Sequence, residues 1–361
     1  MIALDFETIG LEPERGKLRL VQWANDKGSH VYDAWDPQVD LERVLALLAS
    51  KPQMVAHNAN FEEAWLKAHG FEVHLDDTMV MSRILYGGTE GHESLRHPLE
   101  DVALRELGVE LDKEQQQSNW AAPVLSEEQI AYAKRDAEVT LGLYWVLRER
   151  LEDAGLWKVY QLENRARPAV DAMEKRGVAI HRDRLETLIE EATERAEALK
   201  AELEAEWDIN PGSGKQLIEH FKLEGRQGWP KTNGGKPKTD QEAMKRLLKE
   251  EPSVAKWVEW KEIEKIRSTY DTSILSKLDE DGRLRARFNA FGTATGCFSS
   301  SNPNLQNIPK RGTLGPRMRG LFWSGSDDRV LIKADYASIE LWVAAALWDA
   351  PHMQNVPQQG V

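Results

Sequence analysis

A chain of 361 residues with 41% hydrophobic and 30% charged residues is expected to form two or three soluble globular domains. No apolar run reaches the roughly 20 residues that span a bilayer, and the start MIALDFET carries no basic, cleavable secretory signal. The single cysteine, Cys297, excludes an internal disulfide and a cysteine-based zinc site, which is typical of a reducing cell interior.

The net charge of −13 is unevenly distributed along the chain. Residues 1–160 hold 29 acids and 16 bases, whereas residues 161–361 hold 31 of each. Within the neutral part, residues 211–238 carry six bases against two acids, and residues 283–333 carry nine against two. Such basic clusters are typical of a solvated surface or of one that binds a phosphate backbone, and the overall acidity excludes neither.

The first part of the sequence predicts a strand-rich start followed by helices. Alternating and apolar runs within residues 1–35, separated by Gly, Pro and Asp-Lys-Gly turn signals, predict a small meander of strands. A short strand is expected at 54–59, and the helix that follows it is expected to stop at Gly70. Strands first and helices after them favour an α/β or α+β layer. The expected helices cover residues 41–50, 61–70, 77–85, 99–108 and 126–151.

From about residue 156 the sequence predicts mostly helices. Helical segments at 163–177 and 184–207 precede a Gly- and Lys-rich loop at 228–239, and further helices extend to about 278. Residues 282–296 favour a strand and a turn, and residues 331–348 favour a strand that runs into a helix.

Two acids, Asp5 and Glu7, stand one residue apart at the expected end of the first strand. Because residues i and i+2 of a strand point to the same face, the two carboxylates are expected to lie side by side. Like charges so placed repel unless a cation lies between them, which indicates a metal site. An ordinary surface strand is the alternative, since D-x-E is a common short motif.

Three further polar residues occur in informative contexts. Glu62 follows H-N-A-N-F at the start of a helix, where an acid also interacts favourably with the helix dipole. Tyr132 and Asp136 are four residues apart on an expected helix, so they share one face. Taken singly, Asp136 is compatible with an exposed helix acid, and Tyr132 with a core residue whose hydroxyl is bonded locally.

Taken in order, the motifs D-x-E, N-x-x-F-E and Y-x-x-x-D resemble those of the DEDD exonuclease superfamily in its tyrosine-bearing branch. The resemblance implies a ribonuclease-H-like sheet flanked by helices, with four carboxylates that bind two Mg²⁺ or Mn²⁺ ions. Two such ions activate water and relieve charge on the leaving oxygen of a phosphodiester, and hard oxygen ligands suit both metals. The implied ligands are Asp5, Glu7, Glu62 and Asp136, with Tyr132 orienting the attacking water. Glu62 departs from the usual Asp, and we expect activity to survive the longer side chain.

Two distal segments resemble those of family A DNA polymerases, the type found in bacteria and phages. TATGCFSSSNPNLQNIP at 293–309 resembles the family's T-G-R-x-S-S-x-x-P-N-L-Q-N-I-P, and LIKADYASIELWVAAAL at 331–347 resembles its D-Y-S-x-I-E-L-R segment. ENRARPAVDAMEKRGVAI and INPGSGKQL resemble its entry to the thumb, and KEIEKIRSTYDTSIL resembles its thumb helices. The family also places a DEDD exonuclease just upstream, so the resemblance covers practically the whole chain.

The resemblance implies roles for nine residues of the distal half. Asp335 matches the first metal-binding aspartate of the polymerase site, although a helix N-cap is an alternative for it. Tyr336 and Glu340 are expected to contact the incoming nucleotide, and Glu340 matches the residue that disfavours ribonucleotides. The residues expected to contact DNA are Asn304, Gln306, Asn307, Lys310, Arg317 and Arg319.

Departures from the polymerase pattern bear on catalysis. Cys297 and Trp342 stand where the family has Arg, and neither side chain makes the salt bridges or phosphate contacts of an arginine. Ala337 stands where the family usually has Ser. The sequence stops at Val361, before the fingers helix and the H-D-E strand with the second metal-binding aspartate. Since nucleotidyl transfer uses two carboxylates to hold two metals, we expect Asp335 to be vestigial and this chain alone not to polymerise DNA.

The sequence thus predicts an α/β protein: a ribonuclease-H-like exonuclease domain at 1–155, an N-terminal polymerase region and mostly helical thumb at 156–282, and a partial α+β palm at 283–361. The favoured function is a proofreading 3′–5′ exonuclease joined to an incomplete polymerase that binds primer-template, in the cytoplasm of a bacterium or a phage-infected host. The alternative is a non-catalytic or split DNA-binding subunit that needs a complementing chain with the fingers and the rest of the palm. An RNA-processing exonuclease fits less well, because the thumb and palm segments indicate DNA.

Overall fold

The structure is a computed structural model that describes residues 1–89, 91, 95–111, 118–290, 293, 296–309 and 315–350. It divides into two compact units. The first comprises Met1–Gly177 and Arg285–Ile308, and the second comprises Val178–Leu284 and Pro309–Val361. Helix α7 (Trp157–Arg176) therefore groups with the first unit, and the three-domain division drawn from the sequence stays a prediction.

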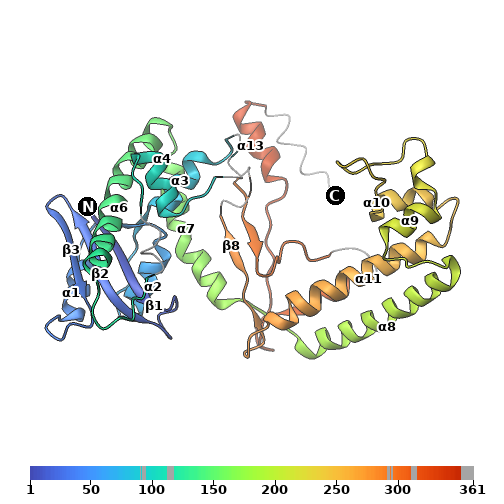
Figure 1. Cartoon of the computed structure of the whole chain (residues 1–361), viewed down its shortest axis with the longest axis horizontal. Helices are drawn as coiled ribbons and strands as arrows, with labels where there is room; N and C mark the ends of the chain where they lie inside the picture. The colour runs from blue at the N-terminus through green and yellow to red at the C-terminus, as the bar shows by residue number, and fades with distance from the viewer. Residues whose placement is uncertain are drawn as a thin grey trace. The chain divides into compact units, whose positions relative to one another are not determined.

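The first unit is built on a five-stranded sheet in the order β3-β2-β1-β4-β5 (Figure 1). Its central strand β1 pairs antiparallel with β2 and parallel with β4. β1 runs from Ile2 to Ile9, so Asp5 and Glu7 lie inside the strand rather than at its end, where the sequence analysis put them. A register shift follows at Glu7/Thr8, and the strand continues because pairing with β2 resumes beyond that irregularity.

Alternation along β1 separates an apolar face from an acidic one. Leu4 and Phe6 are buried in a cluster with side chains of α1 and α2. Ala3 belongs to a second cluster, formed with α3, α4 and α6. Because successive strand residues point to opposite faces, Asp5 and Glu7 share the face of Ala3, against which α6 packs.

Helix α6 begins with a complete capping box. Ser126 accepts a hydrogen bond from the N–H of Gln129, and the Gln129 side chain accepts one from the N–H of Ser126. Elements of the first unit are β1 (Ile2–Ile9), β2 (Lys17–Asn25), β3 (Gly28–Asp33), α1 (Leu41–Ala49), β4 (Met54–Ala56), α2 (Asn60–Ala68), β5 (Asp76–Asp77), α3 (Thr78–Tyr86), α4 (Leu99–Leu107), α6 (Glu127–Asp153), α7 (Trp157–Arg176), β8 (Arg287–Asn289) and β9 (Ser299–Ser301).

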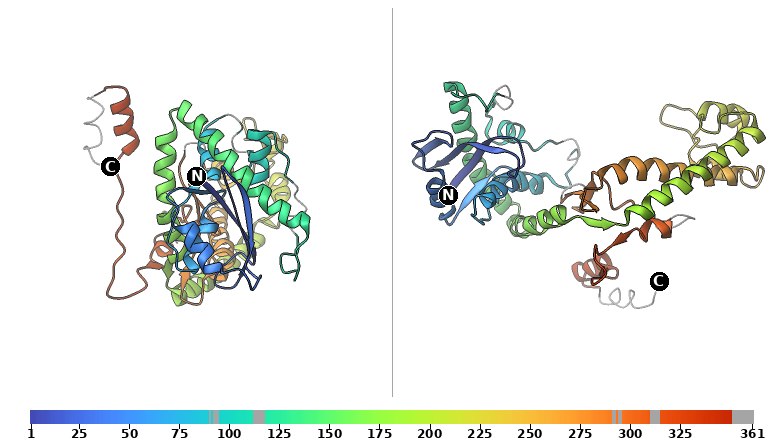
Figure 2. Two further views of the ribbon diagram at one scale, coloured as in Figure 1. Left: turned by 90° about the vertical axis from the view of Figure 1, so that its left-hand side faces the viewer. Right: turned by 90° about the horizontal axis from the view of Figure 1, so that it is seen from below.

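The second unit is dominated by two long helices, α8 and α11, which lie side by side (Figure 2). Their apolar cluster includes four tryptophans, and Trp257 is fully buried with its indole N–H donating to the carbonyl of Pro211. Elements of this unit are β6 (Val178–Ile180), α8 (Arg182–Trp207), α9 (Gly214–His220), η2 (Leu223–Gly225), α10 (Gln241–Met244), η3 (Lys245–Leu247), α11 (Val254–Ser273), η4 (Leu275–Lys277), β7 (Arg283–Leu284), α12 (Gly315–Arg319), β10 (Phe322–Trp323) and α13 (Ile339–Leu347).

The strand expected at 331–335 is not formed. Val330 and Ile332 are 80% and 87% exposed, and no described strand pairs with this stretch. A strand needs partners for its backbone N–H and C=O groups, and an apolar sequence does not supply them. The helix expected after it is present as α13. No helix in the described part of the chain combines the length and apolar character needed to cross a bilayer.

Candidate active site

Three carboxylates converge on the acidic face of β1. One carboxylate oxygen each of Asp5, Glu7 and Asp136 lies within 4.8 Å of the others. Strand β1 supplies the first two, and α6 supplies the third. Gln22, the antiparallel partner of Asp5 on β2, is fully buried, and its Nε2 donates to Asp5 Oδ2 at 2.6 Å. The Asp5 side chain is therefore held in one orientation.

The close approach of these acids disfavours their charged forms. Burial raises the pKa of Asp5 to about 6, although the hydrogen bond from Gln22 opposes that rise. The pKa of Glu7 is raised to about 10, mainly by burial and further by the negative charges of Asp5 and Asp136. Burial, then the charge of Asp5, raises the pKa of Asp136 to about 8. A cation placed among the three would remove this repulsion.

Glu62 lines the same cavity but is not one of the three acids whose oxygens lie within 4.8 Å. It lies in the first turn of α2 and is only 2% exposed. Burial, then the charge of Asp5, raises its pKa well above the ordinary value. A purely structural acid at a helix N-terminus would be expected at the surface, so burial beside Asp5 favours a role in the site.

Tyr132 lies one helical turn before Asp136 on α6, as the four-residue spacing predicted. Its phenol and the Asp136 carboxylate lie close enough to shift each other's pKa. Burial, then the charge of Asp136, raises the pKa of the Tyr132 phenol above its ordinary value. The phenol therefore stays protonated and is available as a hydrogen-bond donor.

These side chains line a cavity of about 270 Å³. Besides the acids, the lining includes apolar residues from α2, α3 and α4, among them Phe61, Met79 and Leu99, and the polar residues His57 and Asn58. Exposed aromatic and apolar side chains are the kind of surface on which nucleobases stack in other proteins. Its lining residues are Asp5, Phe6, Glu7, His57, Asn58, Phe61, Glu62, Met79, Pro98, Leu99, Glu100, Leu111, Tyr132 and Asp136.

The donor set fits a hard divalent cation. Glu62 Oε2 and Asp136 Oδ1 are buried, and neither has a hydrogen-bond partner among the residues that the structure describes. Buried carboxylate oxygens without partners are costly unless something binds them. A set of carboxylate oxygens without cysteine or histidine suits Mg²⁺ or Mn²⁺.

Sequence reasoning missed Gln22 and the apolar lining of the cavity. Gln22 is a polar residue inside the apolar run LRLVQWA, and that interruption was the one available signal. Its bond to Asp5 depends on the register of β1 with β2, which the sequence does not state. Phe61, Met79 and Leu111 come from separate segments and look like ordinary core residues in the sequence.

Family models match nearly the whole chain. The 3′–5′ exonuclease model matches residues 1–152, and the DNA polymerase family A model matches residues 182–361. The chain belongs to DNA polymerase family A. It carries a 3′–5′ exonuclease domain in its first part, as the resemblance of its motifs predicted.

Curated relatives of this family A polymerase chain are bacterial DNA polymerases I. The enzyme from Rhizobium leguminosarum is 34% identical over 344 residues, covering 89% of this chain and 32% of the relative. That from Aquifex aeolicus is 28% identical, covering 99% of this chain and 61% of the relative. The chain thus spans between a third and three fifths of the length of these relatives.

A solved structure shares the fold of this family A chain. It is the POL domain of Pol1 from M. smegmatis in complex with DNA primer-template and dNTP, with a TM-score of 0.77 and 22% identity. The match covers 98% of this chain and 60% of that one. The expected α/β fold class is confirmed.

The residues of the family A polymerase motifs are distributed over both units. Asn304, Gln306 and Asn307 are exposed in the first unit. Asn304 Oδ1 accepts from the N–H of Gln306 at 3.0 Å, and Gln306 Nε2 donates to the carbonyl of Phe298 at 2.8 Å. Two of these side chains therefore also stabilise the loop that carries them.

The other described motif residues lie in the second unit and are exposed. Arg317 forms an ion pair with Glu191 at 2.6 Å, and Arg319 lies two residues further along α12. Asp335 precedes α13 but is not its N-cap, which is Ser338. The other two motif residues are Tyr336, 81% exposed, and Glu340. Lys310 lies outside the described residues.

Proposed function

We propose that the chain hydrolyses the 3′-terminal phosphodiester of single-stranded DNA in the manner of a proofreading exonuclease. The site is the cavity lined by Asp5, Glu7, Glu62, Tyr132 and Asp136, with Mg²⁺ or Mn²⁺ bound by the acids. The observation that carries the proposal is the convergence of three carboxylates from β1 and α6 within 4.8 Å. The match to a 3′–5′ exonuclease model supports the reaction class.

Each of these side chains has a distinct role in the proposed reaction. Two divalent ions would supply the charge that activates the attacking water and stabilises the leaving oxygen. Asp5, Glu7 and Asp136 hold that charge in place, with Glu62 as the fourth acid, and Gln22 fixes the orientation of Asp5. The Tyr132 hydroxyl, on the same face of α6 as Asp136 and lining the same cavity, is placed to orient the water. The apolar lining of the cavity positions the terminal base and excludes bulk water.

A primer-template role is proposed for the distal motif residues. The structural relative that shares this fold is described in complex with DNA primer-template and dNTP. The exposed polar residues 304–307, together with Arg317, Arg319, Tyr336 and Glu340, are available for such contacts. A complementing polymerase chain is part of the same proposal.

The exonuclease proposal is tested with a 5′-labelled single-stranded oligonucleotide. Wild-type chain with Mg²⁺ is expected to shorten the label from the 3′ end, and EDTA to stop the reaction. Asp136→Asn is expected to abolish shortening, because it removes one of the three converging charges. Glu149→Gln, on an exposed position of the same helix, is the matched control and should act like wild type. Wild-type chain that leaves the oligonucleotide intact at every concentration contradicts the proposal.

A further inference from the structure

Helix α7 follows the part of the chain that matches the exonuclease model, and it precedes the part that matches the polymerase model. It nevertheless packs within the first unit. Three of its polar residues, Tyr160, Asn164 and Arg167, are spaced four and three apart and are all buried. That spacing places them on one helix face.

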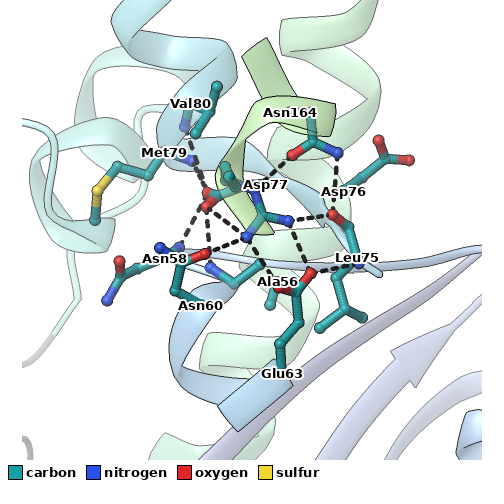
Figure 3. A network of polar contacts seen from close by, with 12 residues as sticks. Ala56, Asn58, Asn60, Glu63, Leu75, Asp76, Asp77, Met79, Val80 and Asn164 are labelled. Carbon is teal, nitrogen blue, oxygen red and sulfur yellow. Dashed lines mark hydrogen bonds and ion pairs between the residues drawn. The ribbon is translucent and has the colours of Figure 1, made fainter. Parts of the chain in front are cut away.

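Arg167 donates hydrogen bonds to four residues that are labelled in Figure 3: Asn60, Glu63, Leu75 and Asn164. Its Nη1 donates to Asn60 Oδ1 at 2.7 Å, and its Nη2 donates to Glu63 Oε1 at 2.9 Å. Nη2 also donates to the carbonyl of Leu75 at 2.6 Å, and Nε donates to Asn164 Oδ1 at 2.8 Å. A planar guanidinium can bridge partners on three segments in this way, whereas an ammonium cannot.

The same network fixes the loop before α2. Asp77 accepts hydrogen bonds from the N–H groups of Asn58 and Ala59 at 3.1 and 3.0 Å (Figure 3). The N–H of Asp77 in turn donates to the hydroxyl of Tyr160 at 3.0 Å. Residues of α7 thus hold the approach to α2 as well as its first turn.

Glu62 lies between two of the residues that α7 holds. Asn60 and Glu63 contact Arg167, and Glu62 projects instead into the cavity with Asp5. Successive helical residues point about 100° apart, so anchoring Glu63 on one side sets the direction of Glu62 on the other. In the described part of the chain Glu62 Oε2 has no hydrogen-bond partner, so its position depends on the helix that carries it.

We propose that Arg167 of α7 is a positioning residue for the exonuclease site, which holds Glu62 of α2 at the distance needed to bind a divalent ion. The inference rests on the proposed function, because it takes Glu62 as a metal ligand. In this proposal α7, which lies between the two matched segments, helps to position the exonuclease site and is not only a linker.

The test measures Mn²⁺ binding by the full-length chain, using calorimetry or electron paramagnetic resonance, so the readout does not depend on turnover. Arg167→Met should weaken Mn²⁺ binding about tenfold, the usual size of an effect on a group that orients a ligand. Arg167→Lys should fall between Arg167→Met and wild type. Arg165→Met, at an exposed position of the same helix, is the matched control and should bind as wild type does.

A double-variant cycle with Glu62→Gln separates positioning from general destabilisation. If Arg167 acts through Glu62, adding Arg167→Met to Glu62→Gln should weaken Mn²⁺ binding little further. The inference would be overturned if the double variant lost Mn²⁺ affinity by the product of the two single-variant effects. It would also be overturned if Arg167→Met folded and bound Mn²⁺ as tightly as Arg165→Met. Should Arg167→Met fail to fold, Asn60→Ala decides instead: unchanged Mn²⁺ binding overturns the inference, and weakened binding supports it. If the wild-type chain binds no Mn²⁺, the result contradicts the proposed function itself.

Discussion

At the scale of single residues, the spacing of the acids was the strongest signal in the sequence. The i, i+2 rule placed Asp5 and Glu7 on one face, and the i, i+4 rule placed Tyr132 beside Asp136. The partners that orient these groups were not predictable, because they come from other segments. Gln22 reaches Asp5 only through the register of two strands.

Tyr132→Phe removes a hydroxyl that lies in the cavity with Asp136. We expect exonuclease activity to fall about tenfold to a hundredfold, since groups that orient a metal site have effects of this size. Stability should change by about 1 kcal/mol or less, because the substitution removes one hydroxyl group and keeps the aromatic ring. Rates on a labelled oligonucleotide and a denaturant titration check both values. An unchanged rate would show that the hydroxyl takes no part in the reaction.

His97 is expected to make stability depend on pH. Its Nδ1 lies 3.0 Å from Ser82 Oγ, and burial, then the charges of Arg105 and Arg83, lowers its pKa from 6.5 to about 4. Between these two values the unfolded chain binds a proton that the folded chain does not. The stability contributed by neutral His97 is therefore present above about pH 6.5 and is lost as the pH falls towards 4.

His97→Gln removes this titration. Melting temperatures of wild type and His97→Gln, measured in parallel from pH 7.5 to 4.5, should approach each other as the pH falls, because only wild type loses the contribution of His97. Two curves that stay parallel over this range would contradict the assignment.

At the scale of elements, capping and periodicity predicted most helices, while strands depended on partners. Helix α6 was expected at 126–151 and is found at Glu127–Asp153, where a capping box fixes its start. The apolar run at 331–335 read as a strand but has no strand partner among the described residues. Helices close their hydrogen bonds locally, whereas a strand needs a neighbour that the local sequence does not reveal.

Ser126→Ala should destabilise the chain by about 1 kcal/mol, because it removes the side chain that accepts from the N–H of Gln129. Ser126→Asp keeps an acceptor at the N-cap and is the conservative control. Denaturant midpoints of the two variants and wild type measure the effect. Equal midpoints for Ser126→Ala and wild type would mean that the cap does not stabilise α6.

At the scale of the whole molecule, the order of the motifs along the chain predicted the family, but not which segments pack together. Residues 285–308 group with the first unit although residues 178–284 belong to the second. Glu174 of α7 accepts from Arg287 Nη1 at 3.0 Å and from the N–H of Phe288. Contacts between residues more than a hundred positions apart leave no periodic signal in the sequence.

The second unit depends on its tryptophan-rich core. Trp257→Ala should lower the stability of this unit by about 3–5 kcal/mol, because it leaves a cavity where a fully buried side chain was. Trp348→Ala, which removes a side chain that is 73% exposed, is the matched control and should cost about 0.5 kcal/mol or less. Denaturant unfolding of both variants gives the comparison. Similar losses for the two would contradict the core assignment.

The most direct test of the account is the location of bound metal. Crystals of the chain soaked in Mn²⁺ should show anomalous scattering peaks within about 2.5 Å of carboxylate oxygens of Asp5, Glu7 and Asp136, the three acids that converge on β1 and α6. A crystal in which Mn²⁺ occupies other positions and leaves these three side chains without an ion would contradict it.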